Sequence, residues 1–183
     1  QKKIRIITYG TRKSNVHCFK KNNKFYIKIF NKIFVLKLFD YDGFELDNLS
    51  CAVGCCISIG IKNKEIINSI VKINKPIGRL QEIGKLKNGS KVIVDYAHTP
   101  DALKNILIAT KINKIKPNLL FGCGGNRDKS KRKTMGLIAN KFAAKVYVTD
   151  DNPRNENPFK IRQSILSKCS KAVEIPDRSI AIQ

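Results

Sequence analysis

Short runs of aromatic and branched apolar residues open the chain and predict β-strands. These runs cover residues 4–9, 25–30 and 32–38. Aromatic and β-branched side chains favour the pleated, half-buried surface of a strand. Asn31 stands between the last two runs, so we expect these two strands to be joined there.

The segment after these strands, up to residue 71, has apolar residues at helical spacing. Asp47 is a suitable N-cap, which predicts a helix from Asn48 to Ser58, and Gly60 is the residue expected to end it. A second helix is predicted over residues 63–71. Both helices precede the first strong break in the pattern.

That break lies at Pro76 and Gly78, where we place a domain boundary between residues 1–74 and 75–183. Beyond it, strands alternate with helices. Strands are predicted over 92–94, 119–121, 145–149 and 172–175, and helices over 99–110, 133–141 and 158–169. We expect the strand at 92–94 to be buried. The alternation predicts an α/β fold with right-handed crossovers and a mainly parallel sheet covered by helices on both faces.

The composition favours a folded, strongly basic protein. Hydrophobic residues make up 42% of the 183 residues, which is enough for a core and argues against disorder. The formal charge is +22, from 36 Lys and Arg against 14 Asp and Glu. The lysines are spread along the chain rather than clustered, which favours solvated positions. A basic nucleic-acid-binding module remains an alternative from a different functional class.

Cysteine spacing and hydropathy exclude several other classes. None of the six cysteines forms a C-x-x-C pair, so zinc-site spacing is absent. No apolar run approaches the ~20 residues of a membrane span, and no signal peptide is visible. We therefore expect a reduced, cytoplasmic protein. Its only methionine is Met135, and we expect the chain to be a piece of a longer protein.

Polar residues gather where two predicted strands stop. Residues 95–101 (Asp-Tyr-Ala-His-Thr-Pro-Asp) follow the apolar run at 92–94, and residues 151–154 (Asp-Asn-Pro-Arg) follow the run at 146–149. Ligands of open parallel sheets bind just beyond the carboxyl ends of the strands. These two stretches are therefore candidates for a binding crevice.

A glycine-rich stretch, residues 122–129, follows a third predicted strand. It is not a P-loop, because Arg127 stands where the motif requires glycine. The glycines suit either a structural turn or a close approach to a ligand. The guanidinium of Arg127 suits a carboxylate or a phosphate. The Asp-Asn-Pro-Arg stretch suits a zwitterion, or equally a polar turn before a helix.

Three further residues have either a structural or a functional role. His98 is either packed and hydrogen-bonded or functional. Asp95 can bond a ribose hydroxyl or a magnesium-bound water, or it can cap the following segment. Arg79, after Gly78 at the inferred hinge, reaches a phosphate on domain closure or is solvated.

Taken together, these segments resemble the Mur ligases of bacterial cell-wall synthesis. The resemblance rests on Gly78-Arg79, residues 94–103, residues 121–129, Met135-Gly136 and residues 149–154, and it spans about residues 77–175. It implies that residues 75–183 form a Rossmann-like C-terminal domain, truncated at its end. Residues 1–72 are similar, more loosely, to the end of the family's central ATPase domain.

The resemblance also implies a reaction. In diaminopimelate-adding members, ATP phosphorylates the carboxylate of the UDP-MurNAc-L-Ala-D-Glu dipeptide. The amino group of meso-diaminopimelate then attacks the acyl phosphate, and an amide forms. Mg²⁺ and cationic side chains offset the charge on the transferring phosphoryl group.

Residue roles follow from the matched positions. Five residues match positions that bind meso-diaminopimelate, with Asp-Asn-Pro-Arg as the signature for this amino acid: Arg127, Asp151, Asn152, Pro153 and Arg154. Asn48, Arg79 and Asp95 match nucleotide contacts. A sister ligase that adds lysine or another amino acid remains an alternative, which would differ at this pocket.

Departures from the family pattern lead us to expect a fragment that is inactive alone. The family's P-loop has no counterpart here, nor does the carbamylated lysine that holds magnesium. Asn126 stands where the family usually has Asp, and Glu45 stands where it has a first Asn.

Overall fold

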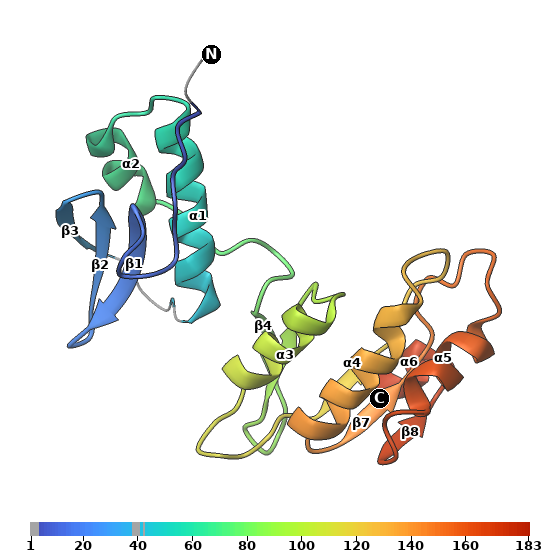
Figure 1. Cartoon of the computed structure of the whole chain (residues 1–183). Helices are drawn as coiled ribbons and strands as arrows, with labels where there is room; N and C mark the ends of the chain where they lie inside the picture. The colour runs from blue at the N-terminus through green and yellow to red at the C-terminus, as the bar shows by residue number, and fades with distance from the viewer. Residues whose placement is uncertain (1–3, 38–40, 42) are drawn as a thin grey trace. The chain divides into compact units, whose positions relative to one another are not determined.

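The structure is a computed structural model that describes residues 4–37, 41 and 43–183. The chain divides into two compact units, residues 1–75 and residues 76–183, and each has a separate hydrophobic core. Figure 1 shows an antiparallel sheet with two helices in the first unit, and alternating helices and strands in the second.

The first unit is built on a three-stranded antiparallel sheet, β1 (Val16–Lys21), β2 (Lys24–Ile29) and β3 (Lys32–Leu36). The strands at β2 and β3 and their junction near Asn31 are confirmed. The sequence analysis missed β1. Its signal was the Asn22-Asn23 pair, whose φ angles of 50° and 57° suit a two-residue hairpin turn.

Helix α1 (Phe44–Ser58) covers one face of this sheet, and α2 (Asn63–Ile70) follows as predicted. The predicted start of α1 was wrong, because the N-cap is Gly43 and Asp47 lies in the first turn. Leu46 is buried in the core with later residues of the helix, and this burial extends the helix toward its N-terminus. The predicted end at Gly60 is confirmed.

The strand predicted over residues 4–9 is wrong for the residues that the structure describes. Only Tyr9 forms a bridge, to Val16, and Ile4 and Ile6 are exposed. An apolar run becomes a strand only where a neighbouring strand accepts its backbone hydrogen bonds. Residue 38, at the end of another predicted strand, lies outside the described residues.

A parallel sheet organises the second unit, with β6 (Leu119–Phe121), β7 (Val146–Val148) and β8 (Ala172–Glu174) in that order. Its crossovers contain α4 (Ser130–Phe142) and α5 (Pro158–Leu166). Helix α3 (Pro100–Ala109) is capped by the Thr99 side chain, as predicted. The α/β fold class with a parallel sheet is thereby confirmed.

Helices α3, α4 and α5 line one face of the parallel sheet, because their apolar residues share one core with Phe121, Val146 and Val148. Figure 1 shows α4 and α5 lying across β7 and β8. Helix coverage of the opposite face stays a prediction. Leu120, Tyr147 and Val173 lie in register on the opposite face, and Val173 is 52% exposed.

The strand predicted at 92–94 forms as β5 (Lys91–Val94), but it is neither buried nor part of the parallel sheet. It pairs antiparallel with β4 (Gln81–Lys85), a strand that the sequence analysis missed. A cavity of about 140 Å³ lined by Ile93 and by residues of β6 lies between the two sheets. Hairpin pairing with β4 satisfies the backbone of β5 locally.

Helix α6 (Arg178–Ile182), also missed, begins at Asp177, whose side chain accepts hydrogen bonds from Ser179 N and Ile180 N. Among the described residues, no helix is both long enough and apolar enough to cross a bilayer.

Candidate functional site

Two loops at the carboxyl ends of β6 and β7 contact each other directly. Gly125 N donates to Asn152 O at 2.9 Å, and Arg154 Nη1 donates to Gly125 O at 2.7 Å. The glycine-rich loop and the Asp-Asn-Pro-Arg loop are thus paired through backbone and side chain. The sheet register brings them together, because β6 and β7 are parallel neighbours.

The glycines are required by this close approach. A Cβ on Gly125 would lie 1.8 Å from Pro153 O, and one on Gly122 would lie 2.4 Å from Thr149 O. Neither distance is possible without moving the backbone of the neighbouring loop. The glycine-rich loop therefore packs against the second loop, which is a structural reason for its composition.

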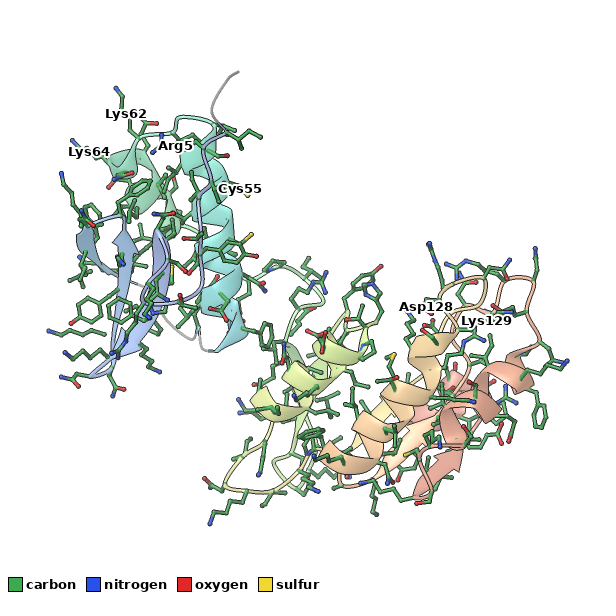
Figure 2. The ribbon with its side chains drawn as sticks, in the orientation of Figure 1. Arg5, Cys55, Lys62, Lys64, Asp128 and Lys129 are labelled. Atoms are coloured by element: carbon green, nitrogen blue, oxygen red, sulfur yellow. The ribbon has the colours of Figure 1, made fainter. Side chains whose placement is uncertain are left out.

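Arg127 and Arg154 lie on these two paired loops, and both are exposed. Among the described residues, the Arg127 guanidinium has no hydrogen-bond or ion-pair partner. Asp151 and Asn152 are also exposed, and Asp151 Oδ1 accepts a hydrogen bond from Asn152 N at 2.8 Å. Figure 2 shows Asp128 and Lys129, which follow Arg127, at the N-terminal end of α4. The arrangement offers guanidinium donors and carboxylate and amide acceptors within one region.

An ion pair between the buried Arg132 and the half-buried Glu156, missed by the sequence analysis, links the two loops. Arg132 of α4 is 4% exposed, and its Nη1 and Nη2 each donate to Glu156 at 3.0 Å. Glu156 also accepts a hydrogen bond from Asn126 N, and Arg132 Nη2 donates to Gly124 O at 3.3 Å. The hydrogen bonds from Arg132 lower the pKa of Glu156 to about 2. A charged pair of this kind has no local sequence signal.

A second buried arginine fixes the end of β7. Arg162 of α5 donates to Asp150 and, through Nε, to Glu174 Oε1 at 2.6 Å. Arg178 Nε donates to Asp150 O at 3.1 Å. Through these contacts Asp150, which precedes Asp151, is held by side chains of α5 and α6, and α5 is also joined to β8.

The Asp95 carboxylate accepts hydrogen bonds from backbone amides, which is the capping role considered for it alongside a nucleotide or magnesium contact. Its Oδ2 accepts from Leu80 N at 2.9 Å and its Oδ1 accepts from Ala97 N at 2.8 Å. The Arg79 guanidinium lies 4.7 Å from the centroid of the Tyr96 ring, a cation–π contact. Both residues lie in the second unit, whereas Asn48 is exposed on α1 of the first unit.

His98 contacts Tyr96 through its ring and Lys131 through its backbone carbonyl. Its ring packs edge-on against Tyr96 at 5.1 Å, and its Nδ1 lies 3.1 Å from Tyr96 O. Lys131 Nζ donates to His98 O at 2.7 Å. His98 is nevertheless exposed, so these contacts do not decide between its two predicted roles.

The two departures from the family pattern have local partners. Glu45 accepts from Lys75 Nζ at 3.0 Å to one oxygen and 3.2 Å to the other. Asn126 has a φ of +50°, a left-handed conformation that asparagine tolerates better than most residues. An aspartate there would also add negative charge beside Glu156.

The described residues show no cluster of side chains suited to a resident metal ion. They contain no group of three or more His, Cys, Asp or Glu side chains that could hold a metal. The whole sequence also lacks a P-loop.

Comparison with known proteins agrees with this geometry. The family profile described as "Mur ligase, glutamate ligase domain" matches residues 78–183. A relative from Anaplasma marginale, named UDP-N-acetylmuramoyl-L-alanyl-D-glutamate–2,6-diaminopimelate ligase, is 40% identical over 97% of this chain and 38% of its own length. A relative of the same name from Rhizobium meliloti is 43% identical over 76% of this chain and 29% of its own length. The chain thus spans well under half the length of these relatives.

Solved structures give the same answer for the fold. A structure of a protein with the same ligase name superposes with a TM-score of 0.53 at 28% identity, over 96% of this chain and 38% of that one. A pseudomurein peptide ligase type C from Methanothermus fervidus superposes with a TM-score of 0.68 at 19% identity, over 89% of this chain and 31% of that one. The matched domain, the relatives and the paired loops lead to one conclusion: the chain belongs to the Mur ligase family.

Proposed function

We propose that this chain is the amino-acid-binding part of an ATP-dependent ligase that adds meso-diaminopimelate to UDP-MurNAc-L-Ala-D-Glu. The observation that carries the proposal is the direct pairing of the two loops that bear Arg127 and Arg154. The relatives that match most of the chain bear the name of this ligase.

The chemistry of the two loops supports a zwitterionic ligand. A guanidinium donates two parallel hydrogen bonds to a carboxylate, which suits Arg127 and Arg154. Asp151 and Asn152 supply acceptors for an ammonium group. The far end of diaminopimelate carries one carboxylate and one ammonium, whereas the side chain of lysine carries the ammonium alone. The arginines therefore discriminate between the two amino acids, and the sister ligase that adds lysine is disfavoured.

In this proposal, residues 1–74 are the end of the central ATPase domain and residues 75–183 are the C-terminal domain, so part of the enzyme lies outside this sequence. Asn48, Arg79 and Asp95 are proposed nucleotide contacts. ATP and Mg²⁺ activate the dipeptide carboxylate when bound, and the missing part of the enzyme supplies the groups that hold them. The residues of this chain orient the incoming amino acid so that its amino group faces the activated carboxylate.

The test is direct ligand binding by the 183-residue chain, followed by NMR chemical shifts. We expect meso-diaminopimelate to shift the backbone amides of Arg127 and of residues 151–154, and we expect L-lysine at equal concentration to shift them much less. Equal shifts with both ligands would favour the lysine-adding alternative. If neither ligand shifts these amides while the chain is folded, the proposal is wrong.

A further inference from the structure

The ion pair between Arg132 and Glu156 occupies an unusual position, since it contacts both loops of the candidate site. Arg132 lies on α4, and Glu156 follows the Asp-Asn-Pro-Arg loop by two residues. The two side chains meet through two hydrogen bonds of 3.0 Å, the fork geometry that arginine makes with carboxylates. Arg132 is 4% exposed, so water competes little for this contact.

Each member of the pair also holds backbone of the glycine-rich loop. Glu156 accepts from Asn126 N, and Arg132 Nη2 donates to Gly124 O. Glu156 in turn is held to its own loop, because its backbone N donates to Pro153 O at 3.0 Å. The pair therefore connects the segment before Arg127 to the segment that carries Arg154.

From these contacts we propose that Arg132 and Glu156 are positioning residues, which hold the two loops in the arrangement where Arg127 and Arg154 can engage one amino acid together. The inference rests on the proposed function. Neither residue touches the ligand in this scheme. Their effect passes through the backbone at Gly124 and Asn126.

The alternative is that the pair only stabilises the fold. The two roles can be separated, because removing the Glu156 charge leaves the buried Arg132 guanidinium uncompensated, whereas removing both charges does not. The informative set is Glu156→Gln, Arg132→Gln and the double variant. We expect urea unfolding midpoints to fall in both single variants and to recover in large part in the double variant.

Diaminopimelate affinity should behave differently from stability. We expect all three variants to bind meso-diaminopimelate about tenfold more weakly or worse, since misplaced binding groups lose much of their benefit. Affinity that recovers together with stability in the double variant would overturn the proposal, as would unchanged affinity in Glu156→Gln.

A matched control comes from the second buried arginine. Glu174→Gln removes one carboxylate from Arg162 without touching the glycine-rich loop. We expect it to lower the urea midpoint but to leave diaminopimelate affinity within about twofold. A loss as large as that of Glu156→Gln would mean that any destabilisation weakens binding, and the positioning role would fail.

If the wild-type chain does not bind diaminopimelate, the proposed function is rejected. The role of the pair in holding the loop can still be tested in that case. Amide hydrogen exchange then serves as the readout. We expect the Asn126 amide to exchange slowly in the wild type and at least about tenfold faster in Glu156→Gln. An unchanged exchange rate would show that the pair does not hold this loop.

Discussion

Arg154 has a left-handed backbone with φ +49°, and its side chain donates to Gly125 O. Replacing it with alanine keeps a Cβ, so the backbone strain stays similar while the guanidinium is lost. We expect Arg154→Ala to weaken diaminopimelate binding by more than about tenfold, since a hydrogen bond to a charged group contributes ~1.5–3 kcal/mol. Titration calorimetry measures the effect. Arg154→Lys retains the charge without the planar guanidinium, so its affinity for diaminopimelate should lie between those of the wild type and Arg154→Ala. An unchanged affinity in Arg154→Ala would contradict the site assignment.

Glu156 makes stability depend on pH in the acid range. Its pKa is lowered from the ordinary glutamate value to about 2 by the hydrogen bonds from Arg132. A lowered pKa in the folded state means that the charged form stabilises the fold above the ordinary glutamate value of about 4.3, and that this contribution is lost as the pH falls toward 2. We expect the difference in urea midpoint between wild type and Glu156→Gln to be constant from pH 7 to 5 and to shrink below about pH 4.5. A difference that stays constant down to pH 2 would contradict the ion pair.

The cysteines should differ sharply in reactivity. Burial raises the pKa of the Cys18 and Cys123 thiols to about 11, so little nucleophilic thiolate forms at neutral pH. Cys55 is exposed on α1. We expect iodoacetamide at pH 8 to modify Cys55 first, and Cys18 and Cys123 only after unfolding in urea. Mass spectrometry of tryptic peptides measures the order, and early labelling of Cys123 would be inconsistent with the core of the second unit.

At the scale of elements, the crossing of α4 and α5 depends on Gly136. A Cβ at this position would lie 2.3 Å from Ile165 O, so alanine would push the two helices apart. We expect Gly136→Ala to lower the free energy of unfolding by about 1–3 kcal/mol, the usual effect of overpacking. Gly84→Ala is the matched control, because no atom lies within 4 Å of the added Cβ. Urea unfolding followed by circular dichroism measures both, and equal midpoints would contradict the close crossing.

Elements with a local chemical signal could be predicted from the sequence. Thr99 and Pro100 mark the start of α3, and the φ of +90° at Gly60 allows α1 to end in a left-handed residue. Gly60 N and Ile61 N donate to Ile57 O and Cys56 O, the double hydrogen bond of a glycine C-cap. Such signals act within a few residues, so they survive in any tertiary context.

Elements whose partners are distant could not be predicted in the same way. The run at residues 4–9 has the composition of a strand but lacks a ladder partner among the described residues, apart from the bridge at Tyr9. Strand β5 was expected in the parallel sheet, yet its backbone pairs with β4. Apolar composition indicates a strand, but it does not identify which neighbour accepts the hydrogen bonds.

The candidate site shows the same division between local and distant information. Arg127 and residues 151–154 stood out because they follow apolar strands, and the parallel register places their loops side by side. Arg132 did not stand out, because a charged residue in a lysine-rich helix is usually solvated. Its burial depends on Glu156, 24 residues away, which no local pattern encodes.

At the scale of the whole molecule, the proposed function divides one reaction between this chain and residues outside this sequence. In this proposal the two paired loops bind the incoming amino acid, whereas the sequence lacks a P-loop and the described residues contain no cluster of metal-ligating side chains. The Anaplasma marginale relative is matched over only 38% of its length. Acyl phosphate formation requires groups that hold ATP phosphates and offset their charge, so it must depend on residues outside this sequence.

This division predicts the behaviour of the chain alone and of a chimera. We expect the purified 183-residue chain to form no amide from UDP-MurNAc-L-Ala-D-Glu, ATP, Mg²⁺ and meso-diaminopimelate, as measured by phosphate release and mass spectrometry. A chimera in which this chain replaces the matching segment of the Anaplasma marginale relative should form the amide, because the remaining segment supplies the phosphate-binding groups. The same chimera with Arg154→Ala should lose diaminopimelate use but keep its affinity for ATP, since Arg154 lies in a loop that we propose binds the amino acid. Amide formation by the isolated chain would mean that these residues hold ATP after all, and a folded, ATP-binding chimera without activity would contradict the assignment of the loops to diaminopimelate.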